Sequence, residues 1–290
     1  MKRVLIVNAD DCNLTPGVTR AILDCHDRGI LTSTTFMANL PVRKETVREL
    51  LKRKNLGVGI HLNVTFGTPL SKPAKIKSLL GTDGLFRPDL KSVGAPLAGA
   101  RSKNGRGQAP PLPVSHEVTL EYQAQIDRFT EVFGRKPTHL DTHHQVHDHP
   151  FFLKVLCEAA EKNALPVRKS SAMFRHFRML VGWNPKACGS PAKASGDDFG
   201  AVRTTDFFFG NLSPEGYWTR EPLTVILQNL PSGVSEIMCH PGRHDKALEA
   251  VSSFREGRQK EWELLRSSFL RTLVKRAGIV PAHFGCAILQ

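Results

Sequence analysis

Short apolar runs and amphipathic segments alternate along the first part of the chain. Residues 4–7 are apolar and mostly β-branched, which predicts a buried strand. Thr15 and Pro16 follow as an N-cap and first-turn pair, so a helix is expected directly after this strand. Further strands are expected over residues 31–37 and 56–63, both rich in β-branched or apolar residues. Strands that alternate with helices over short connections predict a parallel sheet.

The same alternation continues to the carboxyl end of the chain, with two interruptions. The interruptions cover about residues 66–114, which are basic and rich in Gly and Pro, and about residues 170–200. Because the pattern resumes after each, we expect insertions in a single domain over residues 1–290, not linkers. The other expected elements are helices from Pro41 and Pro150 and over residues 118–133 and 262–273, and strands over residues 138–141, 165–168 and 234–240 and within 279–288.

Composition places the chain among soluble globular proteins. It has 290 residues, of which 40% are hydrophobic and 23% charged. Lys2 and Arg3 precede an apolar run that stops at Asp10, which is too short for a signal peptide, and no stretch reaches the length of a membrane span. The six cysteines are scattered without a Cys-x-x-Cys pair, so a reduced, cytoplasmic protein is expected.

The net charge of +13 raises the question of an anionic partner. The sequence contains neither a Lys/Arg-rich helix nor the aromatic signature of an RNA-binding sheet. We therefore interpret the charge as solvated surface charge and expect no nucleic-acid binding. The oligomeric state stays open, with a homodimer as one option.

Metal-competent side chains stand at four predicted strand ends. They are Asp10 and Asp11, His61, Asp141 with His143, and His240. The carboxyl ends of parallel strands meet at one edge of an α/β sheet or barrel, so these groups are expected to converge. One Asp with two His suits a divalent ion with open positions for water and substrate, and a second Asp suits a general base.

Spacing alone leaves part of this assignment open. His143, His144 and His147 follow the same strand and cannot be separated as ligands by their positions. Arg168 stands at another predicted strand end, where it is either a substrate-binding residue or half of a structural ion pair.

Four motifs resemble one known family. Asn-Ala-Asp-Asp at residues 8–11, Gly-Ile-His-Leu-Asn at 59–63, Pro-Thr-His-Leu-Asp-Thr-His-His-Gln-Val-His at 137–147 and Met-Cys-His-Pro-Gly at 238–242 are similar to the YdjC-like carbohydrate deacetylases. These include chitooligosaccharide deacetylases and hopanoid-associated members. The resemblance implies a distorted (β/α) barrel of the glycoside hydrolase/deacetylase type, a divalent metal ion, Mg²⁺ or Zn²⁺, and release of acetate from an N-acetylated amino sugar.

The resemblance also implies roles for individual residues. Asp11, His61 and His143 would bind the metal, Asp10 would be the base that activates water, and His240 would be the acid or a stabiliser of the tetrahedral intermediate. The resemblance does not assign Arg168, which stays a candidate for substrate binding or for a structural ion pair.

Two departures from the family pattern affect this site. Cys12-Asn13 replaces the Phe-Gly that commonly follows the aspartate pair, and Gln145 replaces a histidine. Asn tolerates a positive φ nearly as well as Gly, so the turn is expected to survive. Cys12 would bring a soft ligand close to the site, which would favour zinc.

The sequence thus predicts a metal-dependent hydrolase that removes an N-acetyl group from an oligosaccharide or a glycolipid head group. One alternative is a metal-dependent phosphoesterase, which usually needs more acidic ligands for two ions. The other is a non-catalytic binder of acidic glycan or nucleic acid, which would associate in a strongly salt-dependent way.

Overall fold

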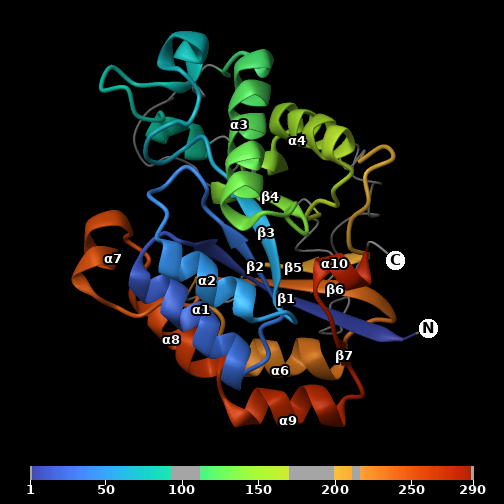
Figure 1. Cartoon of the computed structure of the whole chain (residues 1–290). Coiled ribbons are helices and arrows are strands. Elements are labelled where there is room, and N and C mark those ends of the chain that lie inside the picture. Colours follow the sequence, from blue (N-terminus) through green and yellow to red (C-terminus); the bar gives the residue numbers. More distant parts are fainter. Residues whose placement is uncertain (1, 93–111, 170–198, 211–215, 289–290) are drawn as a thin grey trace, which may run out of the picture.

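Strand β1 (Arg3–Cys12) lies at the centre of a parallel sheet (Figure 1). The computed structural model describes residues 2–92, 112–169, 199–210 and 216–288. Within these residues the strand order is β4-β3-β2-β1-β6-β5, and β7 pairs with β1. The strands are β1, β2 (Ser33–Phe36), β3 (Gly57–Leu62), β4 (Leu140–Thr142), β5 (Phe207–Phe209), β6 (Gly233–Cys239) and β7 (Val280–Pro281).

The sheet curls beyond its two outer strands. Leu140 of β4 forms a parallel bridge with Val167, and the Val167 amide donates to the Arg203 carbonyl at 2.9 Å. The chain after Arg203 leads into β5, which pairs with β6. The sheet therefore has the form of a curled, incomplete ring, and the predicted distorted (β/α) barrel is confirmed.

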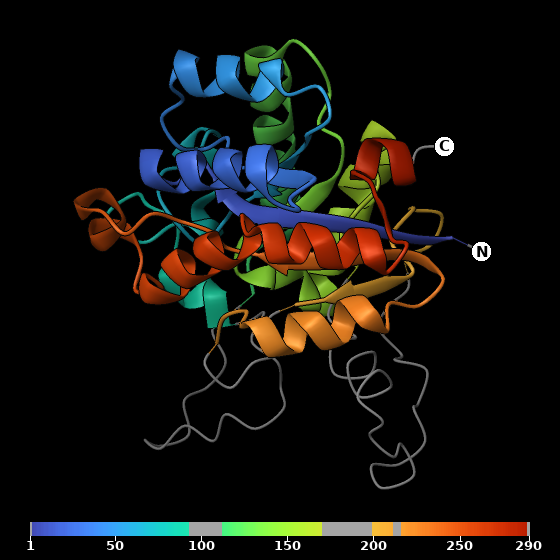
Figure 2. The ribbon, with the colours of Figure 1, turned by 90° about the horizontal axis from the view of Figure 1, so that it is seen from below.

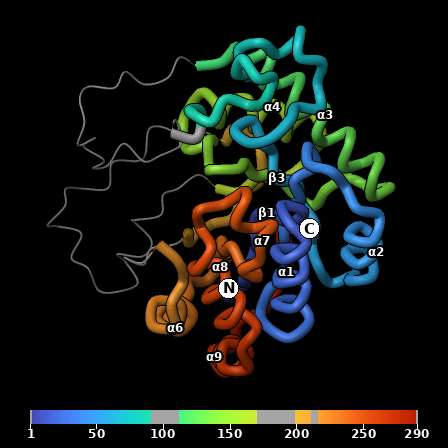
Figure 3. Tube along the Cα trace, turned by 90° about the vertical axis from the view of Figure 1, so that its left-hand side faces the viewer, coloured from blue at the N-terminus to red at the C-terminus, as the bar shows by residue number. Residues whose placement is uncertain are grey.

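Helices surround the strands, as Figure 3 shows. Helices α6 and α9 lie side by side on one face (Figures 1 and 2). None of the described helices is long and apolar enough to cross a bilayer. The helices are α1 (Pro16–Arg28), α2 (Lys44–Lys52), α3 (Ser115–Phe133), α4 (Pro150–Asn163), α6 (Arg220–Gln228), α7 (Lys246–Val251), α8 (Glu256–Leu265), α9 (Ser268–Arg276) and α10 (Phe284–Ala287).

Local sequence explains why α1 begins where it does. The Thr15 side chain accepts a hydrogen bond from the Val18 amide at 3.1 Å, and Pro16 needs no donor at the first helical position. Val18 and Ile22 are fully buried on the face toward the sheet. The helix therefore starts immediately after the carboxyl end of β1 and supports it from outside.

Helix α10 packs on the barrel beside the segment that precedes β4. The His139 and Phe284 rings stack with centroids 3.8 Å apart, and both side chains are fully buried. The strand expected within residues 279–288 is β7, which is only two residues long and pairs with β1; the chain then turns into α10. Local apolar composition did not distinguish a strand from a short helix that packs on an aromatic ring.

Two helix boundaries also differ from expectation. The helix expected from Pro41 begins at Lys44, because Pro41 and Val42 still belong to the preceding loop. The long helix expected over residues 262–273 is two helices, because the Ser267 side chain caps α9 by accepting from the Leu270 amide. Of the two predicted insertions, residues 66–92 form loops with three short 3₁₀ turns, and residues 93–111 and 170–198 lie outside the described part.

Candidate metal centre and active site

A β-bulge shapes the end of β1. In a regular strand, neighbouring side chains point to opposite faces. Here Ala9 pairs with Thr34 but Cys12 pairs with Phe36, so β1 has one more residue than its partner over this interval. Asp11 has a φ of 64°. As a result, the consecutive carboxylates of Asp10 and Asp11 both line one cavity.

Three potential ligand atoms converge beside this bulge. Asp11 Oδ1 lies 3.2 Å from His61 Nε2 and 3.1 Å from His143 Nδ1, and the two histidine nitrogens are 3.2 Å apart. Adjacent ligands of a single Zn²⁺ with bonds of about 2.0–2.2 Å have similar spacing. Asp11 Oδ1 is buried and forms no hydrogen bond of acceptable geometry among the described residues. These donors therefore fit a divalent cation.

Asp141 orients His61. The register of β3 and β4 places these two residues opposite each other, and His61 Nδ1 lies 2.7 Å from Asp141 Oδ1. The Thr35 hydroxyl donates to the other Asp141 oxygen at 3.0 Å. An Nδ1 proton donated to Asp141 would leave Nε2 as the nitrogen that faces Asp11 and His143 and could bind a cation.

The charges around His61 favour a cation. Burial lowers the pKa of His61, but the Asp141 and Asp11 carboxylates raise it by a larger amount. The resulting pKa is about 10. The field that binds a proton so firmly would also attract a metal ion.

Arg258 holds the other oxygen of Asp11. Its Nη2 donates to Asp11 Oδ2 at 2.5 Å, and the side chain is almost completely buried. Burial raises the pKa of Asp11, but Arg258 and His143 outweigh this effect and keep the pKa well below its usual range. Asp11 is therefore ionised, with one oxygen paired to Arg258 and the other directed at the histidines.

Asp10 has a different cationic partner. Arg168 bonds both Asp10 oxygens, at 2.6 and 2.7 Å, and also approaches Asp141 at 2.9 Å and Glu236 at 2.8 Å. Asp10, His61 and Asp141 form a second close group of potential metal ligands. Arg168 already supplies the positive charge that compensates these carboxylates. Burial raises the pKa of Asp10, and Arg168 lowers it more strongly, to about 2.

Arg168 therefore does not reach the cavity in which a substrate-binding residue would be expected. Its side chain is fully buried, and it is not among the residues that line the cavity. The contacts are those of the structural ion pair that the sequence left as the alternative. Its surroundings raise the pKa of the guanidinium well above its usual range despite burial, so the charge is permanent.

His240 stands at the carboxyl end of β6, on the far side of Asp10. Its Nε2 is 3.8 Å from Asp10 Oδ2, and a quarter of the side chain is exposed. Burial lowers the pKa of His240 to about 4, so the ring is neutral near pH 7. The buried Glu261 fixes the backbone here, because its carboxylate accepts from the amides of His240 at 2.6 Å and Trp218 at 3.0 Å.

The two departures from the family pattern have clear positions. Asn13 adopts a φ of 78°, as expected of a residue that replaces Gly in this turn. Cys12 packs in the hydrophobic core, and burial raises the pKa of its thiol to about 12. The expectation that Cys12 would offer a soft ligand is therefore wrong, because its side chain is fully buried and does not line the cavity that Asp11, His61 and His143 line. Gln145 lines the cavity with a φ of 49°.

The structure also separates the histidines that spacing could not. His143 joins the cluster with Asp11 and His61. His144 lines the cavity and contacts the Thr65 hydroxyl at 2.9 Å, and His147 is fully buried against Thr142.

The candidate centre opens into a cavity of about 750 Å³. Asp10, Asp11, His61, His143 and His240 all line it, together with the segment after α7. This volume is in the range of sites for small organic molecules.

Sequence reasoning missed Arg258 and Glu261, which lie one turn apart on α8. Both are charged side chains on a buried helix face beside Trp262 and Leu265. Charged residues on the apolar face of an amphipathic helix are a sequence signal for buried ion pairs, and this signal could have identified both residues.

The fold and the cluster define a class: an α/β-barrel protein with a candidate metal centre at the carboxyl end of its sheet. The family described as YdjC-like protein matches residues 4–276, and the chain belongs to this family.

Known relatives cover nearly the whole chain. A carbohydrate deacetylase of Geobacillus stearothermophilus is 32% identical over 280 residues, which are 96% of each chain. A carbohydrate deacetylase of Halalkalibacterium halodurans is 32% identical over 263 residues, which are 90% of this chain and 94% of the relative. The crystal structure of a candidate cellobiose-phosphate cleavage protein from Enterococcus faecalis V583 matches with a TM-score of 0.77 and 27% identity over 98% of each chain.

Proposed function

We propose that this protein is a divalent-metal-dependent carbohydrate deacetylase. It would hydrolyse the N-acetyl amide of an amino sugar, in an oligosaccharide or a glycolipid head group, to a free amine and acetate. The observation that carries the proposal is the convergence of Asp11 Oδ1, His61 Nε2 and His143 Nδ1 beside Asp10 in one cavity. The names of the two bacterial relatives support carbohydrate deacetylation.

The metal ligands in this proposal are Asp11, His61 and His143. A bound Mg²⁺ or Zn²⁺ ion would acidify a water molecule and polarise the acyl oxygen. Asp141 and Arg258 would then act through the ligands, since the first holds the His61 ring and the second leaves a single Asp11 oxygen free.

Asp10 is the proposed base. It is ionised at neutral pH because Arg168 bonds both of its oxygens, and it lines the same cavity as the ligands. Its low pKa makes it a weak base, so it suits an already acidified water better than free water. Arg168 would position Asp10 without touching substrate.

His240 is proposed to assist on the opposite side of the cavity. Its neutral ring offers an N–H donor that can stabilise the oxyanion of the tetrahedral intermediate or pass a proton to the departing amine. We further propose that residues 1–290 form one domain, which the family match over residues 4–276 supports.

The test measures acetate and phosphate released from N-acetylglucosamine oligomers and from their phosphorylated forms. Wild-type protein should release acetate with Mg²⁺ or Zn²⁺ and lose this activity in chelator. We expect His61→Ala and Asp10→Asn to lower kcat/KM at least 100-fold. His116→Ala, at an exposed position of α3, is the matched control and should keep full activity.

Three outcomes would contradict the proposal. Phosphate release without acetate would identify a phosphoesterase. Tight, salt-sensitive glycan binding without turnover would identify a binding protein. Full activity of His61→Ala would remove the proposed metal centre from the reaction.

A further inference from the structure

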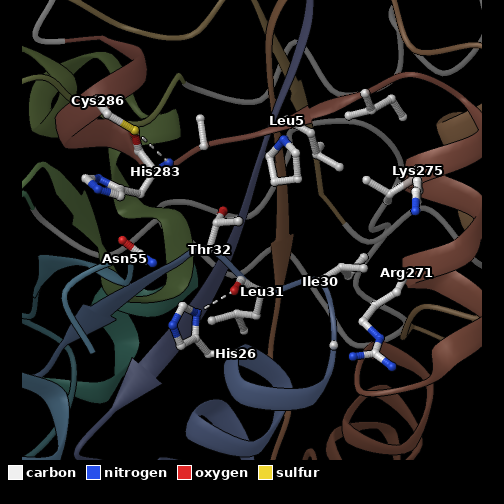
Figure 4. Close-up of a pocket in the computed structure, with 15 residues that line it drawn as sticks. Leu5, His26, Ile30, Leu31, Thr32, Asn55, Arg271, Lys275, His283 and Cys286 are labelled. Carbon is white, nitrogen blue, oxygen red and sulfur yellow. Dashed lines mark hydrogen bonds between the residues drawn. The ribbon is translucent and has the colours of Figure 1, made fainter. Parts of the chain in front are cut away.

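A second cavity, of about 790 Å³, lies at the opposite end of the sheet from the candidate metal centre. Thr32 and Asn55, which line it, precede β2 and β3, whereas His61 lies near the carboxyl end of β3. The ends of α1 and α9, strand β7 and α10 complete its walls. We call it the amino-terminal cavity; Figure 4 shows its lining residues.

The floor of the amino-terminal cavity is apolar. Leu5, Leu31, Val274 and Ile279 line it, and each side chain is largely buried in the protein. In Figure 4, Leu5 and Leu31 lie between two polar walls, one with Arg271 and Lys275 and the other with His26, Asn55 and His283. A volume of this size with an apolar floor and polar groups at its sides is typical of a site for a small organic molecule.

One polar wall carries two positive charges. Arg271 and Lys275 lie one turn apart on α9, and both line the cavity. Like charges at this spacing repel each other on a helix by about 0.2–0.5 kcal/mol. The nearby Arg266 pairs with Asp24 at 3.4 Å, but neither Arg271 nor Lys275 has a carboxylate within 4.0 Å among the described residues.

The facing wall is polar without negative charge. His26, Asn55 and His283 stand there, and His26 Nδ1 lies 2.8 Å from the Leu31 carbonyl, to which it can donate. Among the described residues, none that lines the amino-terminal cavity is Asp or Glu. A cation in this cavity would therefore find no counter-charge, whereas an anion would find two.

We propose that the amino-terminal cavity binds a small organic anion with an apolar body, of the medium-chain carboxylate type. Its charged group would lie between Arg271 and Lys275, and its apolar body would cover Leu31 and Val274. This site is separate from the proposed deacetylation, because it shares no lining residue with the candidate metal centre.

The experiment uses full-length protein and two probes, 8-anilinonaphthalene-1-sulfonate as a fluorescent apolar anion and octanoate as its competitor. We expect saturable dye binding that octanoate displaces. Arg271→Glu and Lys275→Glu should each raise the dye Kd at least tenfold, which corresponds to about 1.4 kcal/mol.

Arg276→Glu is the matched control, because it makes the same charge change on α9 at an exposed residue outside the cavity. It should change the dye Kd less than twofold. Ala282→Trp, which places an indole in the cavity, should abolish both dye binding and the rise in melting temperature caused by octanoate.

Either of two results would overturn the proposal. Equal weakening by Arg276→Glu and Arg271→Glu would mean that only net charge matters. Unchanged dye binding in Ala282→Trp would place the dye elsewhere. Because neither result depends on acetate release, failure here is distinguishable from failure of the proposed deacetylase activity.

Discussion

Asp10 and Asp11 are neighbours in sequence with different electrostatic partners. Arg168 bonds both oxygens of Asp10, whereas Arg258 bonds only one oxygen of Asp11. Both oxygens of Asp10 are thereby paired with an arginine. Asp11 keeps one oxygen that can bind a cation. Two carboxylates with such different bonding partners can have different roles in one reaction.

His147 is a buried histidine whose pKa affects the stability of the protein in acid. His147 is fully buried, and its Nδ1 lies 2.5 Å from the Thr142 hydroxyl. Burial lowers its pKa to about 3, so the ring is neutral in the folded protein over most of the accessible pH range. In the unfolded chain it titrates normally, which links this residue to stability in acid.

We predict that His147→Gln reduces the loss of stability in acid. The folded-state pKa is depressed, so the contribution of His147 is complete above pH 6.5 and is lost as the pH falls toward 3. Between pH 6.5 and 5 the wild type should lose about 2 kcal/mol of unfolding free energy through this group, and the variant should not. Urea unfolding in chelator at the two pH values measures the difference. The exposed His116→Gln should lose as much stability as the wild type, and a parallel pH dependence of His147→Gln and wild type would refute the assignment.

Helix α8 contacts the carboxyl ends of two neighbouring strands, β1 and β6. Arg258 reaches Asp11 at the end of β1, and Glu261 holds the amide of His240 at the end of β6. The same helix packs on α1, where Gly29 lies against the Leu265 carbonyl. Close packing at Gly29 thus sets the position of the helix that supports the site.

We predict that Gly29→Ala is more destabilising than Gly134→Ala. A Cβ at Gly29 would overlap backbone atoms of Leu265 and Arg266, which cannot move without shifting α8. Overpacking of this kind costs about 3 kcal/mol. Gly134 has a φ of 64° but open space around it, so alanine there pays only backbone strain of about 1 kcal/mol. Guanidinium unfolding of both variants gives the comparison, and equal losses would show that α1 and α8 tolerate displacement.

On the scale of the whole molecule, the candidate centre joins distant parts of the chain. Its ligands come from the end of β1, from β3 and from the turn after β4, and Arg258 lies 247 positions after Asp11. A cation at this point would therefore cross-link the first half of the barrel and, through Arg258, its last helices. Unfolding must separate all of these groups, so ion binding and global stability are linked.

We predict that Zn²⁺ or Mg²⁺ raises the melting temperature and that chelator reverses the rise. At an ion concentration 100 times the Kd, the stabilisation should be about 2.7 kcal/mol. His61→Ala should abolish the shift, because it removes a ligand and the partner of Asp141, while His116→Ala should melt like wild type with and without ion. Differential scanning calorimetry measures the shift. A full shift in His61→Ala would place the ion at another site.

The sequence by itself determined the order and type of most elements and the residues at the strand ends. Apolar runs in β1, β3 and β6 and the Thr15 cap of α1 are local signals, which is why these elements form where they were expected. Asp10, Asp11, His61, Asp141, His143 and His240 were identified as candidates because parallel strands bring their carboxyl ends to one edge. The resemblance to the YdjC-like family then selected Asp11, His61 and His143 as the ligands. The strand expected within residues 279–288 has only two residues, because a short apolar segment is compatible with either strand or helix.

Only the tertiary structure decided the directions of the Asp10 and Asp11 side chains and the residues that contact them. The bulge that brings Asp10 and Asp11 to one cavity depends on the register between β1 and β2, which no local pattern specifies. The burial of Arg168 and Cys12, and the contacts of Arg258 and Glu261, arise from packing between elements far apart in the chain. Strand-end position is a local property, but the direction and the electrostatic partner of a side chain exist only after the barrel has closed.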